Sequence, residues 1–207
     1  MDKRPVLLLI EGITASPYIM DDVKSNTTLS KLFAEKYSTT KRIKTTEILD
    51  WGLIGGDILL KYTDVTKFLL NPIRRSLVTG LIERTVAFYN ALNIPVHLLC
   101  HSLGCIEALD SNAKVDKVIL TGCPLEFCSR TGSQGVRTCL SPFPWSKTKL
   151  ECKDLLYFWS EKDFVSCRKP FDLDRFIKAK NIFIFNTNLT HDLKNYLTFA
   201  EKFAPLV

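Results

Sequence analysis

Three residue types that together support nucleophilic catalysis follow three apolar segments of the sequence. Ser102 lies in the stretch VHLLCHSLGCIEAL, after an apolar run and before a helical pattern. Asp163 and His191 follow later apolar runs, in the segments LLYFWSEKDFVS and NIFIFNTNLTHDL. A serine hydroxyl is a weak nucleophile, and a neighbouring histidine can take its proton while an aspartate fixes the imidazole tautomer. The sequence therefore contains a candidate nucleophile, base and orienting carboxylate.

The elements that must position these residues can be predicted from hydrophobic periodicity. Continuous apolar runs that alternate with amphipathic stretches are typical of a parallel sheet buried on both faces by helices. The predicted strands cover residues 5–10, 44–51, 96–100, 117–122, 155–160 and 181–186, and the predicted helices cover about 30–37, 57–70, 72–91, 103–110, 171–179 and 192–203. This order predicts an α/β fold with a doubly wound, mainly parallel sheet of about six strands and helices on both faces.

The predicted sheet brings the three candidate residues to one edge. Ligands of open α/β sheets bind beyond the carboxyl ends of the strands. Ser102, Asp163 and His191 each follow such an end, and the segment 11–14 follows the end of the first predicted strand. We therefore expect these residues to share one edge.

Each candidate also has a simpler interpretation. Ser102 could be an ordinary helix N-cap, because serine accepts backbone N–H bonds well at that position. His191 could be a surface residue that opens a helix, and Asp163 a turn residue, in which case Asp154, Asp172 or Asp192 would be its substitute. His97, inside an apolar strand, is expected to be a core histidine with its hydrogen bonds satisfied.

The segment around Ser102 resembles the nucleophile elbow of the α/β-hydrolase superfamily, where the serine of G-x-S-x-G occupies a strained strand-to-helix turn. Here Cys100 replaces the first glycine and Gly104 is the second. The chain order Ser, Asp, His is also that of the superfamily, and the resemblance extends from the first strand to the final helix. It implies a minimal α/β-hydrolase fold with no separate cap domain and with Ser102, His191 and Asp163 as catalytic residues.

The same resemblance implies a set of supporting groups. The backbone N–H groups of Leu103 and, by position, Ile13 would form the oxyanion hole. Cys100, His101 and Gly104 would support the elbow, because small residues are needed where strand and helix approach each other. Glu11 stands where many members of the superfamily have a histidine.

Length and composition indicate an ordinary globular chain. Its 207 residues favour one domain, 1–207, with residues 52–71 and 123–151 as candidate lid or specificity segments. Apolar residues make up 46% and charged residues 24%, with a net charge of +6. The basic clusters are separated and have no array of stacking aromatic residues, so we expect no nucleic-acid partner.

Cysteine usage and apolar run length limit the remaining classes. The 7 cysteines show no CxxC spacing, which favours reduced thiols in a cytoplasmic setting and matches no common zinc template. No apolar run reaches the roughly 18 residues of a membrane span, and the first run is too short for a signal peptide. We therefore expect a cytoplasmic chain without metal or cofactor, whose oligomeric state the sequence does not indicate.

Taken with the resemblance, these observations predict a serine hydrolase that cleaves a small-molecule carboxyl ester or thioester through an acyl-enzyme intermediate. Two alternatives stay open: an acyltransferase that uses the same residues, and a catalytically inactive interaction protein with the α/β-hydrolase fold. A serine oxygen within hydrogen-bond reach of the histidine would favour an enzyme.

Overall fold

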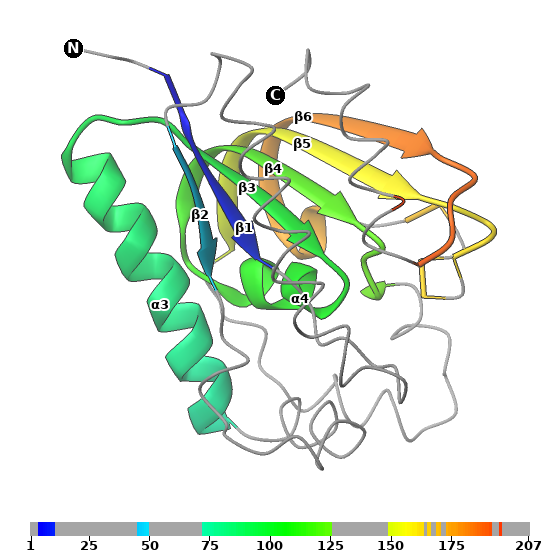
Figure 1. Ribbon diagram of the computed structural model, residues 1–207, viewed down its shortest axis with the longest axis horizontal. Coiled ribbons are helices and arrows are strands. Elements are labelled where there is room, and N and C mark those ends of the chain that lie inside the picture. The colour runs from blue at the N-terminus through cyan, green and yellow to red at the C-terminus, as the bar shows by residue number, and fades with distance from the viewer. Residues whose placement is uncertain are drawn as a thin grey trace.

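In the described residues of the computed structural model, six parallel strands form one sheet (Figure 1). The structure describes residues 4–10, 45–49, 72–125, 149–163, 165–166, 169–170, 173–191 and 195. The strands are β1 (Val6–Ile10), β2 (Thr45–Leu49), β3 (Val96–His101), β4 (Lys114–Thr121), β5 (Leu150–Trp159) and β6 (Ile177–Asn186). Their spatial order is β2-β1-β3-β4-β5-β6. The predicted α/β class with a parallel sheet of about six strands is confirmed.

The order of the strands reverses at β1, because β2 lies on one side of it and β3 on the other (Figure 1). In open α/β sheets such a reversal opens a crevice at the carboxyl ends of the two strands that flank it. Ser102 directly follows β3 and therefore lies at the carboxyl end of one of these two strands.

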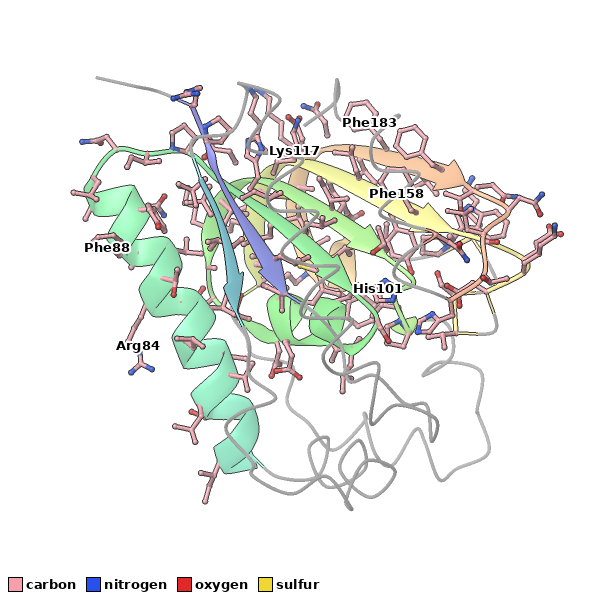
Figure 2. The ribbon with its side chains drawn as sticks, viewed as in Figure 1. Arg84, Phe88, His101, Lys117, Phe158 and Phe183 are labelled. Carbon is pink, nitrogen blue, oxygen red and sulfur yellow. The ribbon has the colours of Figure 1, made fainter. Side chains whose placement is uncertain are left out.

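Within the described ranges, two α-helices pack on one face of the sheet. They are α3 (Pro72–Ala91) and α4 (Leu103–Asp110), and both have the predicted bounds. Proline suits the first position of α3 because its missing N–H would have no partner there, and Asn93 follows the helix with a left-handed φ of 55°. On the side of α3 away from the sheet, Arg84 and Phe88 point outward (Figure 2).

The central strands β1 and β3 are buried on both faces, as their uninterrupted apolar sequence predicts. Val6, Leu8 and Ile10 of β1 belong to the core cluster that contains residues of α3 and α4. Leu7 and Leu9 point to the opposite face, because side chains alternate along a strand, and both have no exposed surface. The sheet is therefore covered on both sides at β1.

One predicted helix is wrong. The sequence predicts a helix over residues 171–179, but in the described part of this range, 173–179, the structure has only a short 3-10 helix, η3 (Leu173–Arg175), before β6 begins at Ile177. Ile177 pairs with Leu150 of β5, so pairing in the sheet overrides the local helical pattern. Strands β4, β5 and β6 also begin 3 to 5 residues earlier than predicted, at Lys114, Leu150 and Ile177.

Several predictions fall outside the described residues. These are the helices at 30–37 and 57–70, the helix at 192–203 apart from Asn195, the segment 52–71, most of the segment 123–151, and the residues Glu11 and Ile13. Within the described ranges, no helix is long and apolar enough to cross a membrane. The four cysteines in those ranges are free thiols, and no cluster of histidine, cysteine or acidic residues there could hold a metal ion.

Candidate active site

Ser102 occupies a strained turn between β3 and α4. Its φ of 54° and ψ of −126° lie in a region that residues with a Cβ rarely adopt. The backbone is held there by two hydrogen bonds: Ser102 N donates to Thr121 O at 3.0 Å, and Cys105 N donates to Ser102 O at 3.0 Å. Among the described residues the Ser102 side chain makes no capping bond to α4, so the simple N-cap interpretation is wrong.

The residues around this turn are small and buried, as the predicted elbow requires. Cys100 and Cys105 have no exposed surface, and Gly104 is also buried in the first turn of α4. Burial raises the pKa of both thiols well above its usual value. Cys100 therefore fills the place of the first glycine as a protonated core residue.

Ser102, His191 and Asp163 form one continuous hydrogen-bonded chain. Ser102 Oγ lies 2.9 Å from His191 Nε2, and His191 Nδ1 lies 2.9 Å and 3.0 Å from the two carboxylate oxygens of Asp163. The Asp163 side chain has no exposed surface, whereas that of His191 is 18% exposed. The structure thus brings together the three residues that the sequence predicts as catalytic.

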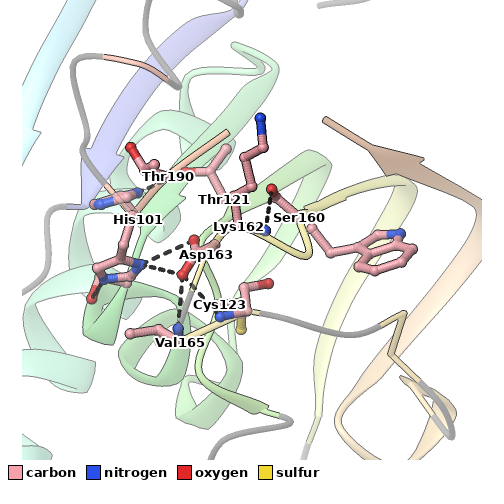
Figure 3. Close-up of polar contacts among 12 residues, drawn as sticks. His101, Thr121, Cys123, Ser160, Lys162, Asp163, Val165 and Thr190 are labelled. Atoms are coloured by element: carbon pink, nitrogen blue, oxygen red, sulfur yellow. Dashed lines mark hydrogen bonds and ion pairs between the residues drawn. The ribbon is translucent and has the colours of Figure 1, made fainter. Parts of the chain in front are cut away.

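Asp163 is fixed by a turn that follows β5. Its Oδ1 accepts hydrogen bonds from the backbone N–H groups of Val165 at 2.8 Å and Ser166 at 3.0 Å (Figure 3). Its own N–H donates to Ser160 O. The turn interpretation of Asp163 is therefore also correct, because the same carboxylate organises the turn and contacts His191. Asp154 instead accepts a hydrogen bond from Asn181.

His191 is carried by the loop that follows β6. Thr187 ties this loop to the end of β5, since its N–H and its hydroxyl both donate to Trp159 O, at 2.8 and 3.1 Å. Further along, Asn195 Nδ2 donates to Thr190 Oγ1 at 2.7 Å. These bonds position the loop so that the imidazole faces Ser102.

Gly122, which the sequence analysis did not identify as a functional residue, makes room for this arrangement. It follows β4 with a φ of 56°. A Cβ at this position would lie 3.0 Å from His191 Nδ1, 3.1 Å from Asp163 Oδ2 and 3.1 Å from His101 Cε1. Both the backbone conformation and the close approach therefore favour glycine. One feature of the sequence could have pointed to Gly122: it is a glycine directly after a buried strand, at the carboxyl edge of the sheet.

His101 and His97 are both buried in β3, at 6% and 8% exposure. Burial lowers the pKa of His101 to about 3, with the nearby His191 charge as the second cause. Burial, followed by the charge of Lys117, lowers the pKa of His97 to about 4. The expectation that His97 is satisfied is wrong, because within the described part of the chain its Nδ1 has no hydrogen-bond partner.

Of the two predicted oxyanion-hole groups, the structure describes one. Leu103 is the first residue of α4 and directly follows Ser102, so its N–H is one of the helix N–H groups without an intrahelical acceptor. The helix dipole also favours negative charge at this end. Ile13 lies outside the described residues.

Comparison with solved structures identifies the fold. A metagenome-derived lipolytic enzyme of the LipS and LipT pair aligns with 99% of this chain and 95% of its own, at 10% identity and a TM-score of 0.53. Est1E from Butyrivibrio proteoclasticus, solved with ferulic acid bound, aligns with 98% of this chain and 87% of its own, at 13% identity and a TM-score of 0.52. Both are α/β-hydrolases. This chain has the α/β-hydrolase fold.

No protein-family model matches the sequence, and neither does any curated protein. A Bacillus cereus protein aligns with 98% of this chain at 16% identity and a TM-score of 0.48, but the chain spans only 60% of that protein's length.

Proposed function

We propose that this α/β-hydrolase chain is a serine hydrolase that cleaves carboxyl esters or thioesters through an acyl-enzyme intermediate. The observation that supports the proposal most strongly is the distance of 2.9 Å between Ser102 Oγ and His191 Nε2, with the Asp163 carboxylate on the opposite nitrogen of the imidazole. Nucleophile, base and orienting group are thus in mutual contact, as acyl transfer to serine requires.

In the proposed acylation step, Ser102 Oγ attacks the carbonyl carbon of the substrate while His191 Nε2 takes the hydroxyl proton. Asp163 accepts a hydrogen bond from Nδ1–H, which fixes the tautomer that leaves Nε2 free to act as a base. The tetrahedral intermediate collapses as the bond to the leaving group breaks, and the imidazolium returns the proton to the departing alcohol or thiol.

In the proposed deacylation step, water takes the place of the serine hydroxyl. His191 Nε2 removes a proton from the water, whose oxygen attacks the acyl carbon, and the same proton then goes to Ser102 Oγ as the ester bond breaks. In both steps the N–H of Leu103 at the start of α4 would donate to the developing oxyanion. By its position after β1, Ile13 would supply the second donor.

Two alternatives to a hydrolase are an acyltransferase and a non-catalytic binding protein with the same fold. An acyltransferase would replace water by an acceptor alcohol or thiol in the second step. A non-catalytic binding protein needs no contact between serine and histidine, so the hydrogen bond between Ser102 and His191 favours an enzyme over it.

Labelling with a fluorophosphonate tests the proposal, because this reagent phosphonylates activated serines. We expect modification of the wild-type chain at Ser102, found by peptide mass spectrometry, and its loss in the variants Ser102→Ala and His191→Ala. Ser76→Ala is a matched control, since Ser76 is exposed on α3. A folded chain that stays unmodified, or labelling that persists in Ser102→Ala, would contradict the proposal.

A panel of p-nitrophenyl esters then defines the reaction. Release of acid at the same rate as p-nitrophenol indicates hydrolysis, whereas formation of a new ester upon addition of an alcohol at millimolar concentration indicates acyl transfer. Varying the acyl chain from acetyl upward shows which acyl groups the site accepts.

A further inference from the structure

His101 is a buried histidine that the proposed mechanism does not use, yet it lies against the proposed base. It is the last residue of β3 and directly precedes Ser102. Its ring centroid lies 5.1 Å from that of His191, and the two ring planes are inclined by 30°. The His101 ring therefore forms one side of the space that the His191 ring occupies.

The His101 ring is itself anchored to the sheet through Thr121. His101 Nδ1 lies 3.1 Å from Thr121 Oγ1, and the Thr121 hydroxyl donates to Cys100 O at 3.0 Å. The direction of the bond between the imidazole and the Thr121 hydroxyl depends on the tautomer of His101, and in either direction this bond holds Nδ1 at the hydroxyl. His101 and Thr121 are paired residues of β3 and β4, which means that both ends of this contact are fixed by the sheet.

Three side chains of the site meet over the Cα of Gly122. His101 Cε1, His191 Nδ1 and Asp163 Oδ2 all lie within 3.0 to 3.1 Å of the place where a Cβ would be. Protein interiors are closely packed, so a shift of the His101 ring changes the space available to the other two groups.

The charge state of His101 suits this contact. Burial and the neighbouring His191 hold the pKa of His101 at about 3, although Asp163 and hydrogen bonds with the backbone of His191 and Thr121 act in the opposite direction. His101 is thus uncharged near neutral pH. An uncharged ring can stay in place when His191 takes up the serine proton, whereas a second imidazolium would repel it.

We propose that His101 is a positioning residue: its ring, anchored by Thr121, packs against His191 and keeps Nε2 directed at Ser102 Oγ. This inference rests on the proposed function, because it assigns His101 a role in the geometry of that reaction. It predicts that the hydroxyl of Thr121, which touches none of the reacting atoms, affects turnover.

Substitutions at Thr121 separate this role from simple packing. Thr121→Val keeps the shape of the side chain and removes the anchor, so we expect kcat to fall about 10-fold with KM changed less than about two-fold. Thr121→Ser keeps the hydroxyl and should restore kcat to within about two-fold of the wild type. Thr85→Val on α3 is the matched control, because it removes a hydroxyl that donates to a backbone carbonyl, that of Leu81, far from the site.

Substitutions at His101 test the ring directly. His101→Ala removes the ring and should lower kcat by roughly 100-fold. His101→Phe keeps a ring against His191 without the anchor, and its kcat should lie between those of His101→Ala and the wild type. If His101→Ala does not fold, the Thr121 variants decide the question.

The measurements are kcat and KM for p-nitrophenyl acetate and the rate of fluorophosphonate modification at Ser102, with the melting temperature of each variant. Wild-type kcat in folded Thr121→Val would overturn the inference, and so would an equal loss in Thr85→Val. These outcomes leave the proposed function intact if Ser102 of the wild-type chain reacts with the fluorophosphonate. A wild-type chain that neither reacts with the fluorophosphonate nor hydrolyses p-nitrophenyl acetate would overturn the proposed function, and this inference with it.

Discussion

The glycine after β4 provides the sharpest test of the site geometry. In Gly122→Ala the new residue must keep a φ of 56°, which costs roughly 1–2 kcal/mol for a residue with a Cβ. Its methyl group must also fit 3.0 Å from His191 Nδ1 and 3.1 Å from Asp163 Oδ2. Together these effects should lower the free energy of unfolding by about 1–3 kcal/mol, which is a fall in melting temperature of roughly 2–12 °C for a chain of this size.

The same methyl group should also reduce activity. Relieving contacts this short requires shifts of a few tenths of an ångström in groups that hold each other in place, and a misplacement of about 1 Å can cost about 100-fold in rate. We therefore expect Gly122→Ala to lower kcat by roughly 10-fold with little change in KM, measured with p-nitrophenyl acetate.

Gly80 offers a matched control, because a Cβ there would have nothing within 4 Å. Gly80→Ala in the middle of α3 should raise stability by up to about 1 kcal/mol, since alanine favours helix, and should leave kcat unchanged. Wild-type stability and wild-type kcat in Gly122→Ala would refute the reasoning. A loss of stability alone would show that only the backbone conformation requires glycine.

Three further predictions concern charge and burial. Asp163→Asn keeps an oxygen that can accept the two backbone N–H bonds but loses the charge that supports His191, so kcat should fall on the order of 10⁴-fold while circular dichroism stays native. The lowered pKa of His97, about 4 against an ordinary 6.5, means that the unfolded chain binds a proton that the folded chain excludes, so stability should fall by up to about 3 kcal/mol as the pH drops from 6.5 to 4. His97→Leu should remove this part of the pH dependence in urea unfolding, and an unchanged dependence would show that other groups cause it. The fully buried thiols of Cys100 and Cys105 should resist iodoacetamide in the native chain and react only after denaturation, as followed by peptide mass spectrometry.

The sequence predicted those elements whose pattern is set by burial alone. β1 is apolar at every position because both of its faces are covered, and α3 has the bounds that Pro72 and Asn93 indicate. Ser102, Asp163 and His191 could be found because each lies within five residues after the end of a strand, and parallel strands bring their carboxyl ends to one edge.

The errors and omissions arose where distant parts of the chain decide the outcome. Residues 177–179 carry a helical pattern but pair with β5, and no local signal reveals that partner. Gly122 and Thr121 gain their importance only because His191, from a loop after β6, reaches β4 in the folded chain. Such contacts are a property of the assembled sheet and not of any segment.

The position of β6 has a consequence for how activity is lost on heating. β6 lies at the end of the described sheet (Figure 1), and Ile182 and Phe183 on it are 38% and 48% exposed. In β3, by contrast, no residue is more than 8% exposed. Elements with few buried apolar contacts open locally at a lower free-energy cost than the core. Opening of β6 would carry His191 away from Ser102 while the centre of the sheet stays intact, so the chain should lose activity at a lower temperature than that at which its core unfolds.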